Sequence, residues 1–241
     1  MLLEDVRSAL VVVAHCDDAE WMFGGTVARL VGQGAAVDYV VTTDGSSGGV
    51  DLSISDAELA ATRAAEQRAA AEVLGVRSVA FLGHRNDELE VSIDLKRELV
   101  RQVRRSRPQL VLTLTPYRAL DAPVDWSHGD HLVTGEATLR AVYPEAIMPR
   151  IYRELLDEGL PPHEVTEVWV PAMTDADLYV DVSGVVQTKM DAVWCHWSQN
   201  GEAAGNREWM FTERIAPPMR AAGERVGCRY AERFRRIPIR G

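Results

Sequence analysis

Two short clusters in the chain hold side chains that bind divalent metal ions and transfer protons. The first reads His15-Cys16-Asp17-Asp18, and the second reads His128-Gly129-Asp130-His131. Three of the six histidines in the 241-residue chain lie in these clusters. Imidazole and carboxylate groups are ligands of catalytic zinc, which binds three protein groups and keeps one position open for water. These residue types therefore indicate metal-assisted hydrolysis.

The first cluster offers separate roles for its two adjacent carboxylates. His15 and Asp18 are three residues apart, so a single turn can aim both side chains at one metal ion. Asp17 points elsewhere and stays available as a base. The plain alternative is that Asp17 or Asp18 only caps the following helix. Adjacent carboxylates repel a phosphate and attract a cation, and the glycines of a dinucleotide-binding turn are absent here.

Both clusters follow predicted strands of one parallel sheet. Residues 10–14 form an apolar, β-branched run that is typical of a buried strand, and the first cluster follows it directly. Further strands are predicted at 37–43, 79–82 and 110–114, alternating with helices at 20–33, 56–74 and 92–107. The second cluster follows the fourth strand after a loop. The carboxyl ends of parallel strands share one rim, so the clusters can meet there. His15, Asp18 and one histidine of the second cluster would then form a metal site, although the second cluster alone is compatible with a surface turn.

The alternation of strands and helices predicts an α/β fold with a Rossmann-like, mostly parallel sheet and helices on both faces. Strands are also predicted at 165–170 and 178–182, and helices at 185–197 and 218–236. We expect a single domain over residues 1–241. Residues 1–145 would form its core, and residues 146–241 a C-terminal extension that shapes the substrate pocket.

Composition excludes several classes of protein. The formal net charge of −10 argues against a nucleic-acid partner. The three cysteines form no C-x-x-C motif, and no apolar run has the length of a membrane span. We expect a cytoplasmic protein with a small-molecule substrate and no membrane partner. A basic stripe near the C-terminus is interpreted as a solvated face, or alternatively as a contact for an anionic substrate or another subunit; it comprises Arg225, Arg229, Arg233, Arg235, Arg236 and Arg240.

With both clusters at this separation, the chain resembles the zinc-dependent de-N-acetylase family named after LmbE and PIG-L. The resemblance covers residues 10–199 and implies a Rossmann-like fold. That family has a His-Pro-Asp-Asp turn after its first strand and a His-x-Asp-His turn after a later one. Further matches are Thr43-Asp44-Gly45, Arg63 with Glu66, Leu82-Gly83 with Asp87, and His196-x-Ser198-Gln199.

The resemblance implies a role for each residue of the two clusters. His15, Asp18 and His131 resemble the ligands of one zinc ion per chain, for which Fe²⁺ is an alternative. Asp17 resembles the general base. His128 resembles the protonated group that stabilises the tetrahedral oxyanion, and Asp130 the carboxylate that orients and charges it.

Three further residues are predicted to contact the substrate. Arg63 and Asp87 resemble family positions that hydrogen-bond sugar hydroxyls or an anionic group, and Trp126 is placed to stack on a sugar. Each has a structural alternative: Arg63 as a helix-surface partner of Glu66 or Gln67, Asp87 as a turn residue, and Trp126 as a packing residue at the rim.

One residue departs from the family pattern. Cys16 stands where the family has proline, which would fix φ and stiffen the turn. Cys16 as a fourth ligand is the sharper alternative, but a thiolate there would occupy the position of the water and prevent hydrolysis.

The resemblance implies metal-dependent hydrolysis of an N-acetyl group from an N-acetylglucosamine-type glycoconjugate, releasing acetate and a free amine. One alternative is an amidase that acts on a larger acyl conjugate. Another is a non-catalytic Rossmann-like module that binds a sugar or nucleotide. The missing glycine fingerprint and the complete set of catalytic residues argue against the last of these.

Overall fold

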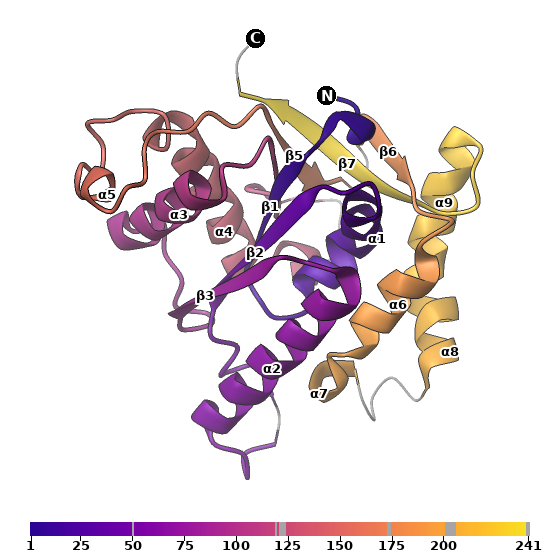
Figure 1. The fold of residues 1–241 in the computed structure, drawn as a ribbon. Helices are drawn as coiled ribbons and strands as arrows, with labels where there is room; N and C mark the ends of the chain where they lie inside the picture. Colours follow the sequence, from indigo (N-terminus) through magenta and orange to yellow (C-terminus); the bar gives the residue numbers. More distant parts are fainter. Residues whose placement is uncertain (50, 119, 121–123, 173–174, 201–205, 240–241) are drawn as a thin grey trace.

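A computed structural model describes residues 1–239 apart from residues 50, 119, 121–123, 173–174 and 201–205. Its strands form one seven-stranded sheet with the order β3-β2-β1-β4-β5-β7-β6 (Figure 1). The strands are β1 (Ser8–Val13), β2 (Ala36–Thr43), β3 (Ser78–His84), β4 (Leu110–Thr113), β5 (Glu167–Pro171), β6 (Leu178–Asp181) and β7 (Ala231–Pro238). Strands β1 to β5 pair in parallel, and β7 pairs antiparallel with both β5 and β6. The predicted Rossmann-like α/β fold is confirmed.

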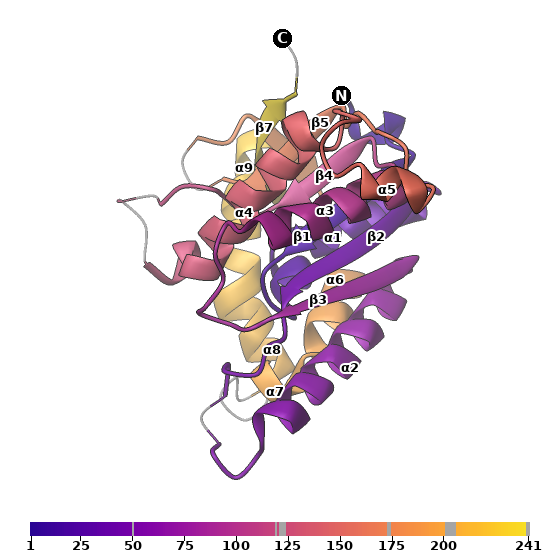
Figure 2. The same ribbon diagram turned by 90° about the vertical axis from the view of Figure 1, so that its left-hand side faces the viewer.

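Helices cover both faces of the sheet (Figures 1 and 2). The longer ones are α1 (Asp18–Gly32), α2 (Asp56–Leu74), α3 (Ile93–Ser106), α4 (Gly129–Arg140), α6 (Val186–Trp194) and α9 (Ala216–Val226). Three short ones are α5 (Glu154–Asp157), α7 (Trp197–Asn200) and α8 (Arg207–Trp209). Together they leave the central strands without a solvent-facing side.

Strand β1 lies in the middle of the sheet because its side chains are apolar on both faces. Val11 packs in the core that includes α1, α2 and α6, whereas Leu10 and Val12 pack in the core beneath α3 and α4. The strand is therefore held from both sides, and the turn that follows it starts from a fixed point.

The C-terminal part of the chain differs from its prediction in two places. The helix predicted over residues 218–236 is wrong beyond Val226, where Gly227 takes a φ of 75° and ends α9. The chain then forms β7, which carries several arginines of the basic stripe; Arg240 lies outside the described residues. The helix predicted over residues 185–197 is interrupted after Trp194, and α7 begins at Trp197. Residues 146–239 thus complete the sheet with β5, β6 and β7.

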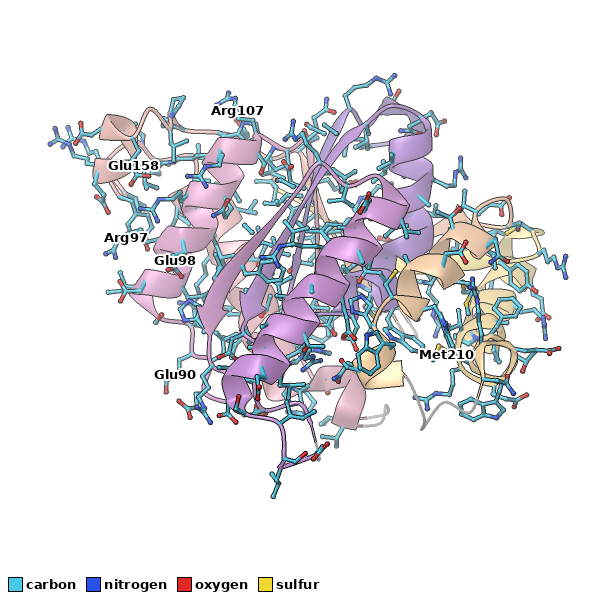
Figure 3. All side chains as sticks on the ribbon, turned by 60° about the horizontal axis from the view of Figure 1, so that its bottom comes forward. Glu90, Arg97, Glu98, Arg107, Glu158 and Met210 are labelled. Carbon is cyan, nitrogen blue, oxygen red and sulfur yellow. The ribbon has the colours of Figure 1, made fainter. Side chains whose placement is uncertain are left out.

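The outer surface of α3 carries charged side chains, among them Arg97 and Glu98 (Figure 3). Arg101 of the same helix donates two hydrogen bonds of 2.8 Å to Glu158. Such exposed pairs contribute little to stability. Among the described residues, no helix has both the length and the apolar character needed to cross a bilayer.

Candidate active site

The two histidine-carboxylate clusters meet at the carboxyl ends of β1 and β4. The first cluster is the turn between β1 and α1, and the second begins α4. The ring centre of His15 lies 5.1 Å from that of His128 and 5.2 Å from that of His131. The prediction that the clusters share one rim is therefore confirmed.

Close packing of α4 against the segment after β4 brings the second cluster to this rim. Gly135 lies one helical turn beyond His131, and a Cβ atom at Gly135 would come within 2.4 Å of the carbonyl oxygen of Leu114. Any side chain here would push α4 away from the sheet. A glycine at this position therefore sets the depth at which His131 enters the site.

Three donor atoms in the site converge on one point. His15 Nδ1 lies 3.2 Å from His131 Nε2. Asp18 Oδ1 lies 3.1 Å from His131 Nε2, and Asp18 Oδ2 lies 3.5 Å from His15 Nδ1. Bonds of 2.0–2.2 Å in a tetrahedral zinc site separate ligand atoms by about 3.4 Å. These three residues therefore fit a divalent metal ion in both donor type and spacing.

The charges at this point favour a cation. Burial would lower the pKa of His15, but its hydrogen bonds with Asp130 and Asp18 outweigh burial and raise the pKa to about 10. Burial would likewise raise the pKa of Asp18, yet His131 and His15 hold it well below its usual range. The carboxylates thus stabilise positive charge, which a proton supplies when no metal is bound.

Asp130 contacts the opposite edge of the His15 ring. Its Oδ2 atom lies 3.1 Å from His15 Nε2 and accepts a 2.9 Å hydrogen bond from the backbone N–H of Asp87. These bonds outweigh burial and lower the pKa of Asp130. A carboxylate at this position fixes the tautomer of His15, so that Nε2 carries the hydrogen and Nδ1 keeps its lone pair for a metal.

His128 is oriented by two groups. Its Nδ1 atom accepts a 3.3 Å hydrogen bond from the backbone N–H of Asp130, which leaves Nε2 as the donor atom. Nε2 lies 3.1 Å from Asp87 Oδ1, and the side chain of His128 is 40% exposed. His128 Nε2 therefore faces the carboxylate of Asp87, whereas the Asp130 carboxylate faces His15.

Asp17 holds an unusual backbone conformation between the ligand residues. Its φ is 106°, a region that residues other than glycine rarely adopt. Burial, with the adjacent charge of Asp18, raises the pKa of the Asp17 carboxyl to about 7. A cation held by Asp18 would lower that pKa again. Asp17 thus has the properties of a proton acceptor at neutral pH.

Arg63 is buried beneath the first cluster. Its guanidinium donates hydrogen bonds of 3.0 Å to the carbonyl oxygen of Gly45 and 3.4 Å to that of Cys16. Arg63 therefore joins the loop after β2 to the turn after β1, instead of lying on the helix surface beside Glu66. Because its side chain is 4% exposed, most of it is unavailable to a ligand in this structure.

The other predicted residues differ in how much the structure describes. Asp87 lies at the rim with a φ of 63° and accepts a 3.3 Å hydrogen bond from Ser47. Cys16 is buried, and burial is the main cause that raises the pKa of its thiol to about 12. Cys16 belongs to neither group of potential metal ligands found among the described residues. The side chain of Trp126 lies outside the part of the chain that the structure describes.

A buried polar group lies behind Asp17, and sequence reasoning singled out only one of its members, His196. In this group Glu20 on α1 lies within hydrogen-bond distance of Gln67 on α2 and of His196 after α6. Glu20 lies two residues after the first cluster, and an acidic residue at the start of a helix is usually solvated there. The signal available was a charged residue among apolar neighbours, which does not by itself reveal burial.

Comparison with known proteins adds independent observations. The family profile described as PIG-L: GlcNAc-PI de-N-acetylase matches residues 10–142, a span that holds both clusters. The diacetylchitobiose deacetylase of Thermococcus kodakarensis is 33% identical over 234 residues, covering 97% of this chain and 84% of the relative. The 1D-myo-inositol 2-acetamido-2-deoxy-alpha-D-glucopyranoside deacetylase of Rhodococcus erythropolis is 27% identical over 270 residues, covering 88% of each.

A solved structure extends the likeness to the fold. The N,N′-diacetylchitobiose deacetylase from Pyrococcus horikoshii superposes with a TM-score of 0.88 and 29% sequence identity. The superposition covers 98% of this chain and 85% of that one. The C-terminal part, which the family profile does not match, therefore also resembles a known deacetylase in structure.

Proposed function

Because this chain belongs to the PIG-L family of de-N-acetylases, we propose that it hydrolyses the N-acetyl group of an N-acetylglucosamine-type glycoconjugate, releasing acetate and a free amine. The named substrates of its relatives, diacetylchitobiose and an N-acetylglucosaminyl inositol, support this class of substrate. The observation that carries the proposal is the convergence of His15, Asp18 and His131 beside Asp17.

We assign His15, Asp18 and His131 as ligands of a zinc ion, with Fe²⁺ as an alternative that the same donor set fits. When bound, the metal supplies a Lewis acid that lowers the pKa of a water molecule towards about 7 and polarises the amide carbonyl. The role of Asp130 is to hold His15 in the tautomer that presents Nδ1 to the metal, through the 3.1 Å contact at Nε2.

Asp17 and His128 then supply the remaining chemistry. Asp17 takes a proton from the attacking water and returns it to the departing amine as the C–N bond breaks. Its raised pKa, about 7 in the metal-free protein, supports this exchange. His128 donates its Nε2–H to the developing oxyanion, a contribution of a few kcal/mol where one such donor is removed. For this, the substrate oxygen replaces Asp87 as the acceptor.

The substrate pocket is assigned to the rim around these residues. Asp87 is exposed there and is free to bind a sugar hydroxyl once His128 has turned to the substrate. Arg63 acts from beneath by holding the turn, and Trp126 remains a proposed stacking residue. We retain the proposal that residues 146–241 shape the pocket of a core formed by residues 1–145. A cytoplasmic location remains an expectation.

The proposal is tested by measuring free acetate from N,N′-diacetylchitobiose and from N-acetylglucosaminyl inositol, with metal content determined on the same samples. We expect Asp17→Asn to keep its metal and to lose about 10²- to 10⁴-fold in rate, because it removes the base. Asp94→Asn is the matched control, since Asp94 is an exposed carboxylate on α3 that pairs with Arg97.

Three outcomes would contradict parts of the proposal. Full activity of Asp17→Asn removes Asp17 from the role of base. Preferential hydrolysis of N-acyl chains longer than acetyl favours the amidase alternative. A metal-free protein that binds the sugars without releasing any acyl group is the non-catalytic module.

A further inference from the structure

A chain of buried hydrogen bonds ties the backbone of Asp17 to the C-terminal part of the protein. The backbone N–H of Asp17 donates a 3.1 Å hydrogen bond to Gln67 Oε1. Gln67 Nε2 donates to both carboxylate oxygens of Glu20, at 3.0 and 3.1 Å. Glu20 Oε2 lies 2.9 Å from His196 Nε2. Glu20, Gln67 and His196 are each fully buried.

The hydrogen-bond polarity of this chain has only one solution. A backbone N–H can only donate, so the side-chain atom of Gln67 that faces Asp17 must be its oxygen. The amide NH₂ of Gln67 then faces Glu20, whose carboxylate can only accept. His196 must in turn donate from Nε2. Each member therefore orients the next, from the C-terminal segment to the catalytic turn.

The conformation at the end of this chain requires such support. A φ of 106° at a residue with a side chain costs about 1–3 kcal/mol and persists only where the surroundings hold it. Gln67 bonds the backbone of the strained residue itself, and its position is set in turn by Glu20. Helix α6 packs against α1 and α2 and carries the chain to His196, which places all three elements behind one turn (Figure 1).

The segment after α6 is fastened at a second point. The backbone N–H and the hydroxyl of Ser198 both donate to the Glu66 carboxylate, at 2.9 and 2.7 Å. Glu66 precedes Gln67 on α2, so the two bonds fix this segment against the same turn of α2 that supports Asp17. His196 is thus held by its own contact with Glu20 and by the attachment of Ser198, two residues later, to α2.

We infer that Gln67 is a positioning residue for Asp17, and that Glu20 and His196 set its orientation so that the C-terminal segment governs where the proton acceptor lies. This inference rests on the proposed function, because it gives Asp17 the role of base. None of the three residues touches the substrate or donates to the metal in this account. Their effect is therefore expected chiefly on the rate of the chemical step, with smaller changes in substrate and metal binding.

The central test is an exchange of hydrogen-bonding groups between two neighbouring positions. Gln67→Glu sets a carboxylate against that of Glu20 and so misplaces Asp17. Glu20→Gln can still turn its amide oxygen towards Gln67 when His196 changes tautomer and accepts at Nε2, so its effect is smaller. The double variant restores one amide and one carboxylate with the same net charge. We expect kcat to fall 10- to 100-fold in Gln67→Glu, to fall less in Glu20→Gln, and to recover at least tenfold from the Gln67→Glu level in the double variant, with KM and metal content within threefold.

Two further variants distinguish a misplaced Asp17 from a protein that does not fold. Gln67→Met keeps the side-chain length without introducing charge, and we expect the same loss of kcat with a cooperative thermal transition. Gln187→Glu is the matched control, because Gln187 also donates to a carboxylate, that of Asp191, but on an exposed helix face. It should leave kcat unchanged.

Crystal structures of the wild type and of Gln67→Met provide a readout that does not depend on activity. We expect φ of Asp17 to leave the positive region in the variant. If the wild type releases acetate but Gln67→Met keeps both kcat and the positive φ, the inference is overturned while the proposed function stands. If the wild type releases no acetate, the proposed function fails, and φ at Asp17 in Gln67→Met still decides whether Gln67 holds the turn.

Discussion

The buried charges at the carboxyl ends of β1 and β4 differ from those between α1 and β7 in how they are neutralised. At the first place, the ring nitrogens of His15 and His131 and the carboxylate of Asp18 converge on a common point, and Asp18 also accepts a 2.9 Å hydrogen bond from the backbone N–H of His15. At the second, Glu232 accepts from Lys189 Nζ at 2.5 Å, and also from the N–H groups of Gly25 and Thr26.

The group around Glu232 satisfies its own hydrogen bonds and charges without a ligand. Lys189 also donates a 2.8 Å hydrogen bond to the carbonyl oxygen of Trp21, and the Thr26 hydroxyl donates to Glu232 at 2.6 Å. A Cβ atom at Gly25 would lie 2.6 Å from Val182, so a glycine is needed for this close approach. The comparison teaches that matched donors and acceptors mark a structural cluster, whereas converging acceptors mark a site that needs a cation.

Removing a ligand from the proposed metal site should have the largest effect on function. We expect His131→Ala to lose its metal and about a thousandfold or more in acetate release, because the metal contributes several kcal/mol to the transition state. Elemental analysis and the acetate assay measure the two losses. Retention of one metal ion per chain by this variant would remove His131 from the ligand set. It would also weaken the contrast between the metal site and the group around Glu232.

Breaking the Lys189–Glu232 pair should act on stability alone. Lys189→Met leaves the Glu232 carboxylate buried without its counter-charge, which typically costs about 3–5 kcal/mol in the free energy of unfolding. Metal content and kcat of the folded protein should stay unchanged. Denaturant unfolding measures the loss, and adding Glu232→Gln to the same chain should recover part of it. A loss of metal in Lys189→Met would show that the group around Glu232 is coupled to the metal site.

The metal affinity of the site that contains His15 should depend on pH. Because the pKa of His15 is about 10 without metal, a bound proton must leave before a metal binds. The dissociation constant for Zn²⁺ should therefore fall about tenfold per pH unit between pH 6.5 and 8. In the metal-free protein, the raised pKa stabilises the fold fully below pH 6.5, and that contribution is lost as pH rises through about 10. A dissociation constant that does not change with pH would contradict a protonated His15.

The smallest change in stability is expected at an exposed ion pair on the outside of α3. Arg101→Ala removes two hydrogen bonds to Glu158 on the outside of α3 and should cost at most about 1 kcal/mol in the free energy of unfolding. Raising the salt concentration should shrink this difference further. A loss as large as that of Lys189→Met would mean that burial does not separate the two kinds of charge.

Local sequence patterns were sufficient for the first half of the fold and for the convergence of the site. The apolar runs of β1 and β4 indicate buried strands because their neighbours on both faces must be apolar. His15 and Asp18 could be grouped with one histidine of the His128–His131 segment because parallel strands end on the same side of a sheet, and the family resemblance then selected His131. Both arguments need only a short window and a rule about strand direction.

The remainder depends on partners far away in the sequence. Residues 231–238 read as a continuation of a charged helix, and only pairing with β5 and β6 makes them a strand. Glu20 and Gln67 look like solvated helix positions until His196 and Asp17 provide their hydrogen-bond partners. The carboxylate that faces His128 is likewise set by the loop after β3, which brings Asp87 to the ring. No short window holds this information.

The long reach of these contacts has a consequence for synthesis on the ribosome. The residues of the two histidine-carboxylate clusters all lie before residue 132. In contrast, the group that orients Asp17 through Glu20 is His196, and the carboxylate that accepts from the middle of α1 is Glu232. A nascent chain that ends before these residues has the parts of a hydrolase without a fixed geometry for them. Assembly of a competent centre therefore requires residues that are synthesised well after strands β1 to β4.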